Sequence, residues 1–249
     1  MLRTAMGRQF GLSGEPCVYC HGARLSTRSG DHVFARQFFA EERRGNLPKV
    51  PACVECNAEK SQLEHYLTAV LPNVGCHQDA EVARTMALSR LAANERLRRE
   101  LEEGRQVSMI RTAPGVASAC TTVPFDGDRL LSFFRFAAKG LLWHHWGITL
   151  AETHDVFAGC VAIGSEAQLK PFFESKLKAQ VREDLGAGTF RYEGAQHAAD
   201  PQFSLWKFTI HEGVTLTAPG GQADHALQTI VAISGRRELV RQLITQLRR

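Results

Sequence analysis

Four cysteines of this chain have the spacing of metal ligands. They form two Cys-x-x-Cys pairs, Cys17 with Cys20 and Cys53 with Cys56. Four thiolates from two tight turns make a complete tetrahedral shell for Zn²⁺ and leave no position open for a substrate. Unrelated buried cysteines and a redox Cys-x-x-Cys are the alternatives, but paired units in a reducing compartment are typical of metal sites. The spacing therefore predicts a structural zinc ion.

Between and just after these pairs stand residues that could perform hydrolysis. The carboxylate of Asp31 is a hard oxygen ligand that suits Mg²⁺ or Mn²⁺, and the imidazole of His32 can take a proton from water near neutral pH. Asn57 follows the second cysteine pair at the start of an expected helix over residues 57–71, so its amide oxygen could reach the same ion. Lys60 lies about one turn later and could meet a phosphate.

The phrase "DHV" followed by "GNLPKVPACVECNAEK" resembles the HNH endonuclease family, in particular the subgroup with two Cys-x-x-Cys zinc knuckles, one on each side. The resemblance covers about residues 15–71 and implies the ββα-metal fold. It implies that Asp31 binds the catalytic metal and that Asn57 completes the metal site. It also implies that His32 is the general base and that Asn46 orients this histidine through backbone carbonyl contacts.

The loop before Asn46 departs from the family pattern. In that family this loop often carries Gly and Pro, whereas the stretch "VFARQFFAEERRG" over residues 33–45 is apolar and then charged. We expect a short extra helix there.

The resemblance implies a metal-dependent endonuclease that hydrolyses phosphodiester bonds in DNA with one Mg²⁺ or Mn²⁺ ion, leaving 5′-phosphate and 3′-hydroxyl ends. RNA stays open as a substrate, and bacterial defence or a mobile element is a setting in which such nucleases serve. Positive charge gathers in the first part of the chain, where residues 1–60 contain nine Lys and Arg against six Asp and Glu. Cationic side chains in this part are candidates for phosphate contacts: Arg24, Arg28, Arg36, Arg43, Arg44, Lys49 and Lys60.

A non-catalytic zinc-ribbon module that binds nucleic acid is the competing hypothesis. Such a module needs the cysteines and the basic residues, but it has no use for a carboxylate ligand beside a base. Asp31, His32 and Asn57 therefore discriminate between the two hypotheses. In a third and weaker interpretation, residues 111–249 sense a ligand that switches the nuclease on.

The rest of the chain predicts an α+β protein with three parts. We expect a zinc-stapled HNH module over residues 1–72, a helical connector over 73–110 and a C-terminal α+β domain over 111–249. Periodic apolar residues predict one long helix from about Asp79 to Gly104, and "AQLKPFFESKLKAQV" over 167–181 predicts another. The stretch 111–128 is rich in Pro, Gly, Ser and Thr and is the best candidate for a linker.

Composition adds few constraints. Hydrophobic residues are 44% and charged residues 22% of the chain, which is ordinary for a globular protein. No apolar run is long enough for a membrane span and the first residues lack the apolar core of a secretory signal, so we expect a cytoplasmic protein. A homo-oligomer through residues 111–249 is left open. His144 and His145 stand between two tryptophans, which favours a half-buried helix end over base stacking or a metal site.

Overall fold

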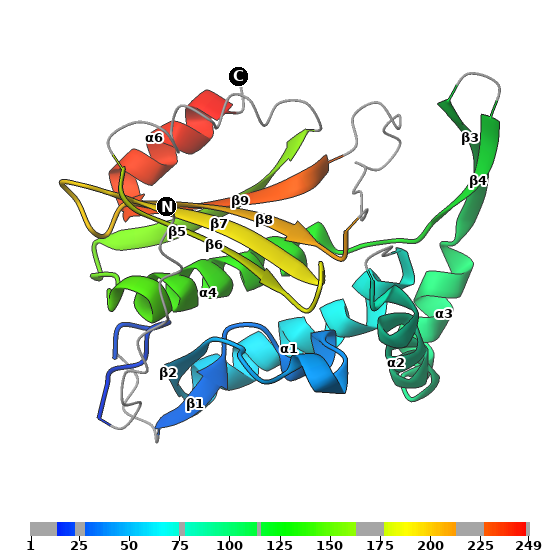
Figure 1. Cartoon of the computed structure of the whole chain (residues 1–249), viewed down its shortest axis with the longest axis horizontal. Coiled ribbons are helices and arrows are strands. Elements are labelled where there is room, and N and C mark those ends of the chain that lie inside the picture. The colour runs from blue at the N-terminus through cyan, green and yellow to red at the C-terminus, as the bar shows by residue number, and fades with distance from the viewer. Residues whose placement is uncertain are drawn as a thin grey trace.

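A computed structural model describes residues 14–22, 28–74, 78–113, 116–162, 177–212 and 227–247. A long helix lies at the centre of the arrangement, with a large sheet on one side of it and a small hairpin and its helix on the other (Figure 1). The sequence prediction of an α+β protein is confirmed, because these residues form both helices and antiparallel sheets.

Residues 28–70 form a β-hairpin followed directly by a helix, here called the hairpin–helix unit. Strand β1 (Arg28–His32) pairs antiparallel with β2 (Lys49–Cys53), and helix α1 (Val54–Val70) continues from β2 without a loop. The connection between the strands contains two 3₁₀ turns, η1 (Arg36–Phe38) and η2 (Glu41–Arg43). The expected extra helix in this loop is confirmed in the form of these two short turns.

The predicted long helix from Asp79 to Gly104 was wrong, because it is broken in two. Helix α2 spans Ala80–Ala92 and helix α3 spans Glu95–Glu103. The side-chain oxygen of Asn94 accepts a hydrogen bond from the backbone of Leu97 at 3.1 Å, which makes Asn94 the N-cap of α3. A 3₁₀ turn, η3 (Leu71–Val74), links α1 to this pair.

The predicted linker over residues 111–128 was also wrong. Strand β3 (Gln106–Ala113) pairs antiparallel with β4 (Val116–Thr122), and helix α4 (Gly127–Trp146) begins soon afterwards. Val, Ile and Thr favour strands, so cross-strand pairing overrides the linker-like composition. This hairpin extends away from the large sheet beside α3 (Figure 1).

The large sheet contains five antiparallel strands in the order β5-β9-β8-β7-β6. Helix α6 (Arg237–Leu247) packs against β5 and β9, on the side of the sheet opposite α4 (Figure 1). The helix predicted over 167–181 was wrong for residues 177–181, which pair with β7 as part of β6; residues 167–176 lie outside the described part of the chain. The strands are β5 (His154–Ala162), β6 (Leu177–Leu185), β7 (Phe190–His197), β8 (Ser204–Ile210) and β9 (Leu227–Arg236).

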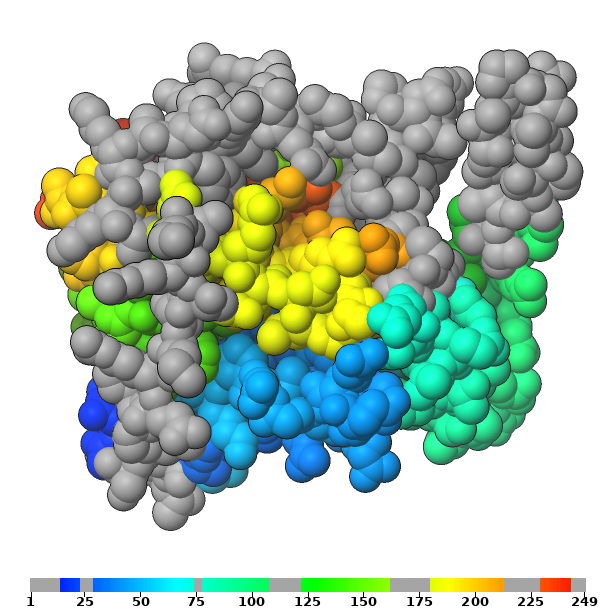
Figure 2. All heavy atoms as spheres, in the orientation of Figure 1, coloured from blue at the N-terminus to red at the C-terminus, as the bar shows by residue number. Residues whose placement is uncertain are grey.

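One continuous apolar core joins the hairpin–helix unit to α4 and the large sheet. Phe34, in the loop after β1, stacks on Phe190 of β7 with ring centroids 4.6 Å apart. Phe38 meets the same ring edge-on at 4.9 Å, and Phe133 of α4 lies 5.7 Å from Phe38. The surfaces of the unit and of strands β6 and β7 are in direct contact (Figure 2). Apolar side chains from residues 1–72 and from residues 111–249 are therefore buried in the same core.

The two adjacent histidines end helix α4 inside this assembly. Both are half-buried, and the Nε2 atom of His145 lies 2.9 Å from the hydroxyl of Tyr192 on β7. The interpretation of this pair as a half-buried helix end is confirmed. Among the helices formed by the described residues, none is both long and apolar enough to cross a bilayer.

Candidate functional site

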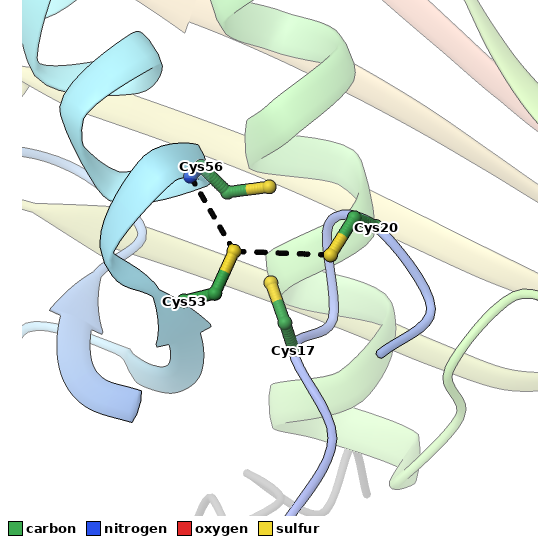
Figure 3. A group of neighbouring side chains, drawn as sticks. All are labelled: Cys17, Cys20, Cys53 and Cys56. Carbon is green, nitrogen blue, oxygen red and sulfur yellow. Dashed lines mark hydrogen bonds between the residues drawn. The ribbon is translucent and has the colours of Figure 1, made fainter. Parts of the chain in front are cut away.

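The four predicted zinc ligands come together. Their sulfur atoms all lie within 4.8 Å of one another, and the sulfurs of Cys20 and Cys53 are 3.8 Å apart (Figure 3). A tetrahedral ion with Zn–S bonds of about 2.3 Å requires sulfur atoms separated by roughly 3.8 Å. The residues therefore fit a structural zinc ion, and the fit comes from side chains that are far apart in the sequence.

Local backbone structure explains how the sulfur atoms of each cysteine pair are oriented towards the other pair. Cys53 ends β2 and caps α1, with its sulfur accepting a hydrogen bond from the backbone N–H of Cys56 at 3.5 Å. Gly22 has a φ of +75°, a conformation that suits glycine, and its N–H donates to the carbonyl of Cys17 to close the other turn. The backbone N–H of Val18 donates to Pro51 of β2 at 3.1 Å, which ties this turn to the hairpin.

Burial favours the neutral form of two of these thiols. Desolvation raises the pKa of Cys53 and that of Cys56. A zinc ion binds the thiolate forms and so couples metal binding to the folding of both turns.

Asp31 is at the centre of a buried polar cluster beside the two cysteine turns. The hydroxyl of Tyr19, from the first cysteine turn, donates to its Oδ2 atom at 2.6 Å. The ammonium of Lys60 lies 3.1 Å from the same oxygen and also donates to the carbonyl of His32 at 2.7 Å. Glu64, one turn further along α1, lies 2.5 Å from that ammonium. Asp31 thus connects β1 both to the turn that carries Cys17 and Cys20 and to α1.

The predicted phosphate contact of Lys60 disagrees with this placement. The side chain is fully buried and its ammonium is surrounded by the oxygen atoms of Asp31, Glu64 and His32. Lys60 therefore lies on the face of α1 that packs against β1, away from solvent. We therefore correct its role from nucleic-acid contact to internal ion pair.

The surroundings of Asp31 also disagree with the divalent ion expected on Asp31 and Asn57. The two residues do lie on facing surfaces, since the amide nitrogen of Asn57 is 3.5 Å from the hydroxyl of Ser29, which shares a face of β1 with Asp31. Their oxygens are of the type that Mg²⁺ prefers. However, the negative charge of Asp31 is already paired with Lys60. In this arrangement the residues do not fit a divalent ion at Asp31.

His32 differs from Asp31 in its surroundings. It is half-buried and lies directly across from the exposed Lys49 in the β1–β2 register, so both side chains stand on the same face of the hairpin. Burial lowers the pKa of His32 below its usual value, and the positive charges of Lys49 and Arg36 lower it further, against an opposing effect of Asp31. The half-buried imidazole of His32 thus has a lowered pKa and lies across from the exposed ammonium of Lys49.

Replacing Lys49 with alanine should raise the pKa of His32. A positive charge beside the ring disfavours the imidazolium, so its removal makes protonation easier and moves the titration to higher pH. An NMR titration of the His32 ring in the folded protein measures this shift. Lys207→Ala, on a strand of the large sheet, is the matched control and should leave the titration in place. An unchanged His32 titration in Lys49→Ala would show that the cross-strand charge does not act on the His32 ring.

The structure describes the remaining predicted site residues to different extents. Asn46 is exposed in the turn before β2, and within the described chain no hydrogen bond joins it to His32, so its orienting role stays a prediction. Arg36 is exposed. The backbone of Arg28 lies in β1 while its side chain, like the whole of Arg24, is outside the described part of the structure.

Two other arginines of the predicted set have partners within the chain. The Nε atom of Arg44 donates to the carbonyls of Arg36 and Phe39. Arg43 forms an ion pair with Asp79 at 3.3 Å. Both therefore help to hold the loop between β1 and β2 in shape.

Sequence reasoning missed Tyr19 and Glu64. Glu64 follows Lys60 by four residues, a spacing at which opposite charges meet on a helix, so the pair itself was detectable. The burial of Glu64 was not detectable from the sequence, because Lys60 and Glu64 face β1 only once the hairpin has formed. Desolvation raises the pKa of Glu64 to about 7, and Lys60 opposes that rise.

Comparison with known proteins gives no match: no family model, no curated protein and no solved structure is significantly similar to this chain.

Proposed function

We propose that this chain hydrolyses phosphodiester bonds in nucleic acid, with DNA as the expected substrate and His32 as the general base. One observation carries the proposal: the half-buried imidazole of His32, whose pKa is lowered by burial and by nearby positive charge, lies across from the exposed Lys49 on one face of the hairpin, and the exposed Arg36 stands in the loop that follows β1. A base must be unprotonated to accept a proton, and a phosphate needs positive charge beside it. The hairpin supplies both at the same place.

The residues of this face suggest the steps of the reaction. His32 accepts a proton from a water molecule, and the resulting hydroxide attacks phosphorus. Lys49 and Arg36 hold the non-bridging oxygens and stabilise the charge that grows on them. The bond from phosphorus to the 3′-oxygen then breaks, and that oxygen takes a proton from solvent. The products are a 5′-phosphate and a 3′-hydroxyl end.

The zinc ion has a positioning role in this proposal. It fixes the turn that carries Tyr19, and Tyr19 donates to Asp31, the residue before the base. Burial and the Asp31 carboxylate raise the pKa of Tyr19 well above its usual value, so its hydroxyl remains a donor. Zinc thereby holds the end of β1 in place without touching the substrate.

The HNH resemblance implies a second metal, a divalent ion on Asp31 and Asn57 that would supply charge stabilisation at the phosphate. The proposed reaction does not use such an ion, because the carboxylate of Asp31 is already paired with the ammonium of Lys60. Dependence on a divalent metal is a question for the assay below.

A non-catalytic nucleic-acid-binding module is the second candidate function. One observation favours it: Asp31, the residue that would distinguish a nuclease, already has a structural role with Tyr19 and Lys60. In that case the cations of the hairpin bind the phosphate backbone and His32 is only part of the surface.

Incubation of the full-length protein with supercoiled plasmid separates the two candidates. Parallel reactions contain Mg²⁺, Mn²⁺ or EDTA, and the same samples are examined for retarded plasmid under non-cleaving conditions. Nicked or linear products support the proposed hydrolysis, and the EDTA sample, with the zinc content of the protein checked, tells whether a divalent metal besides zinc is required. Retardation with no cleavage in any of the samples would refute hydrolysis and support the binding module.

A further inference from the structure

The ammonium of Lys60 is surrounded by oxygen atoms in the way that a bound metal ion is. Glu64 Oε1 lies at 2.5 Å, the carbonyl oxygen of His32 at 2.7 Å, and the two carboxylate oxygens of Asp31 at 3.1 and 3.4 Å. The four oxygens come from β1 and α1, the two elements that face each other in the hairpin–helix unit. The side chain is fully buried, so solvent does not compete for these contacts.

The chemistry of this oxygen cage is that of a site for a hard cation. Two carboxylates and one backbone carbonyl are the ligands that Mg²⁺ and Mn²⁺ prefer. A lysine ammonium is the only cation that the described residues place among them. A divalent ion on Asp31 would have to lie beside that buried positive charge, with little solvent between them to weaken the repulsion.

We propose that Lys60 is the resident cation of the hairpin–helix unit, and that its ammonium takes the place between Asp31, Glu64 and the His32 carbonyl that a divalent ion would otherwise occupy. The chain then carries its own counter-charge and binds no divalent ion at Asp31. The His32 carbonyl accepts from this ammonium, so Lys60 also fixes the backbone of the candidate base. This inference deepens the proposed function at the same site, but it concerns metal binding and holds whether or not the chain cuts nucleic acid.

The proposal predicts that removal of the ammonium creates a divalent metal site. Lys60→Ala leaves two buried carboxylates without a counter-charge and opens the space that the lysine chain filled. Such carboxylates are costly when charged and unpaired, so the variant should be destabilised in the absence of metal and stabilised by Mn²⁺. The wild-type protein should show neither effect.

Electron paramagnetic resonance with Mn²⁺ tests this on the full, zinc-loaded chain, since the signal of free Mn²⁺ falls as the ion binds. Wild type should leave the free signal unchanged, Lys60→Ala should deplete it, and the double variants with Asp31→Asn or Glu64→Gln should restore it. Lys60→Ser, which also removes the charge and opens the space but keeps a small polar group towards the carboxylates, serves as a second variant if Lys60→Ala does not fold.

Two results would overturn the proposal. One is wild-type depletion of the Mn²⁺ signal that Asp31→Asn abolishes, because a divalent ion would then bind beside Lys60. The other is a folded, zinc-loaded Lys60→Ala or Lys60→Ser that takes up no Mn²⁺. Neither result depends on nuclease activity, so a failure of this inference and a failure of the proposed function are distinguishable.

Discussion

Replacement of Cys53 with serine is expected to remove the zinc ion and to destabilise the hairpin–helix unit. Cys53 contributes a sulfur to the four-cysteine site and also caps helix α1 through the N–H of Cys56. Structural zinc sites bind with about 10–16 kcal/mol in small domains, and much of that free energy stabilises the fold. We therefore expect a loss of stability of several kcal/mol, seen as a lower unfolding midpoint by circular dichroism.

The zinc content of the purified variant is the measurement that isolates this effect. Wild type should contain stoichiometric zinc and Cys53→Ser much less. Cys160→Ser is the matched control, because Cys160 is half-buried on β5 and is not part of the four-cysteine group. Unchanged zinc stoichiometry in Cys53→Ser would contradict the assignment of the site.

The second large effect is expected for Phe34→Ala. The ring is fully buried and stacks on Phe190, so the substitution leaves a cavity between the hairpin–helix unit and the large sheet. Such truncations cost about 3–5 kcal/mol. Because one core joins the two parts, chemical denaturation should show a single transition, shifted as a whole to lower denaturant.

An exposed valine of the same unit gives the control. Val54 is 50% exposed at the start of α1, and Val54→Ala should change the denaturation midpoint little. Two separate transitions, with only one of them moved by Phe34→Ala, would show that the hairpin–helix unit and the sheet fold independently.

The parts that the sequence predicted well depend on local spacing. Two Cys-x-x-Cys turns are recognisable because each needs only neighbouring residues, and the structure brings all four sulfurs together. Helix α1 follows from its apolar periodicity, although its first turn begins at Val54, before the predicted start.

The parts that the sequence did not predict depend on contacts between distant residues. The β3–β4 hairpin was mistaken for a linker because its composition resembles one, while its stability comes from pairing across the strands. Residues 177–181 have helical spacing but pair with β7. Lys60 was assigned to a phosphate because its type suits one, and only the packing of α1 against β1 shows that it faces Asp31.

The most direct test of the proposed function is the rate of plasmid nicking by His32→Ala beside His65→Ala. Both residues belong to the hairpin–helix unit, but His65 is exposed on α1 and has no role in the proposed reaction. Loss of a general base costs about 10²–10⁴-fold in rate, so His32→Ala should be slower by that factor with its zinc content unchanged, while His65→Ala cuts like wild type. Nicking by His32→Ala at the wild-type rate would contradict the assignment of His32 as the base.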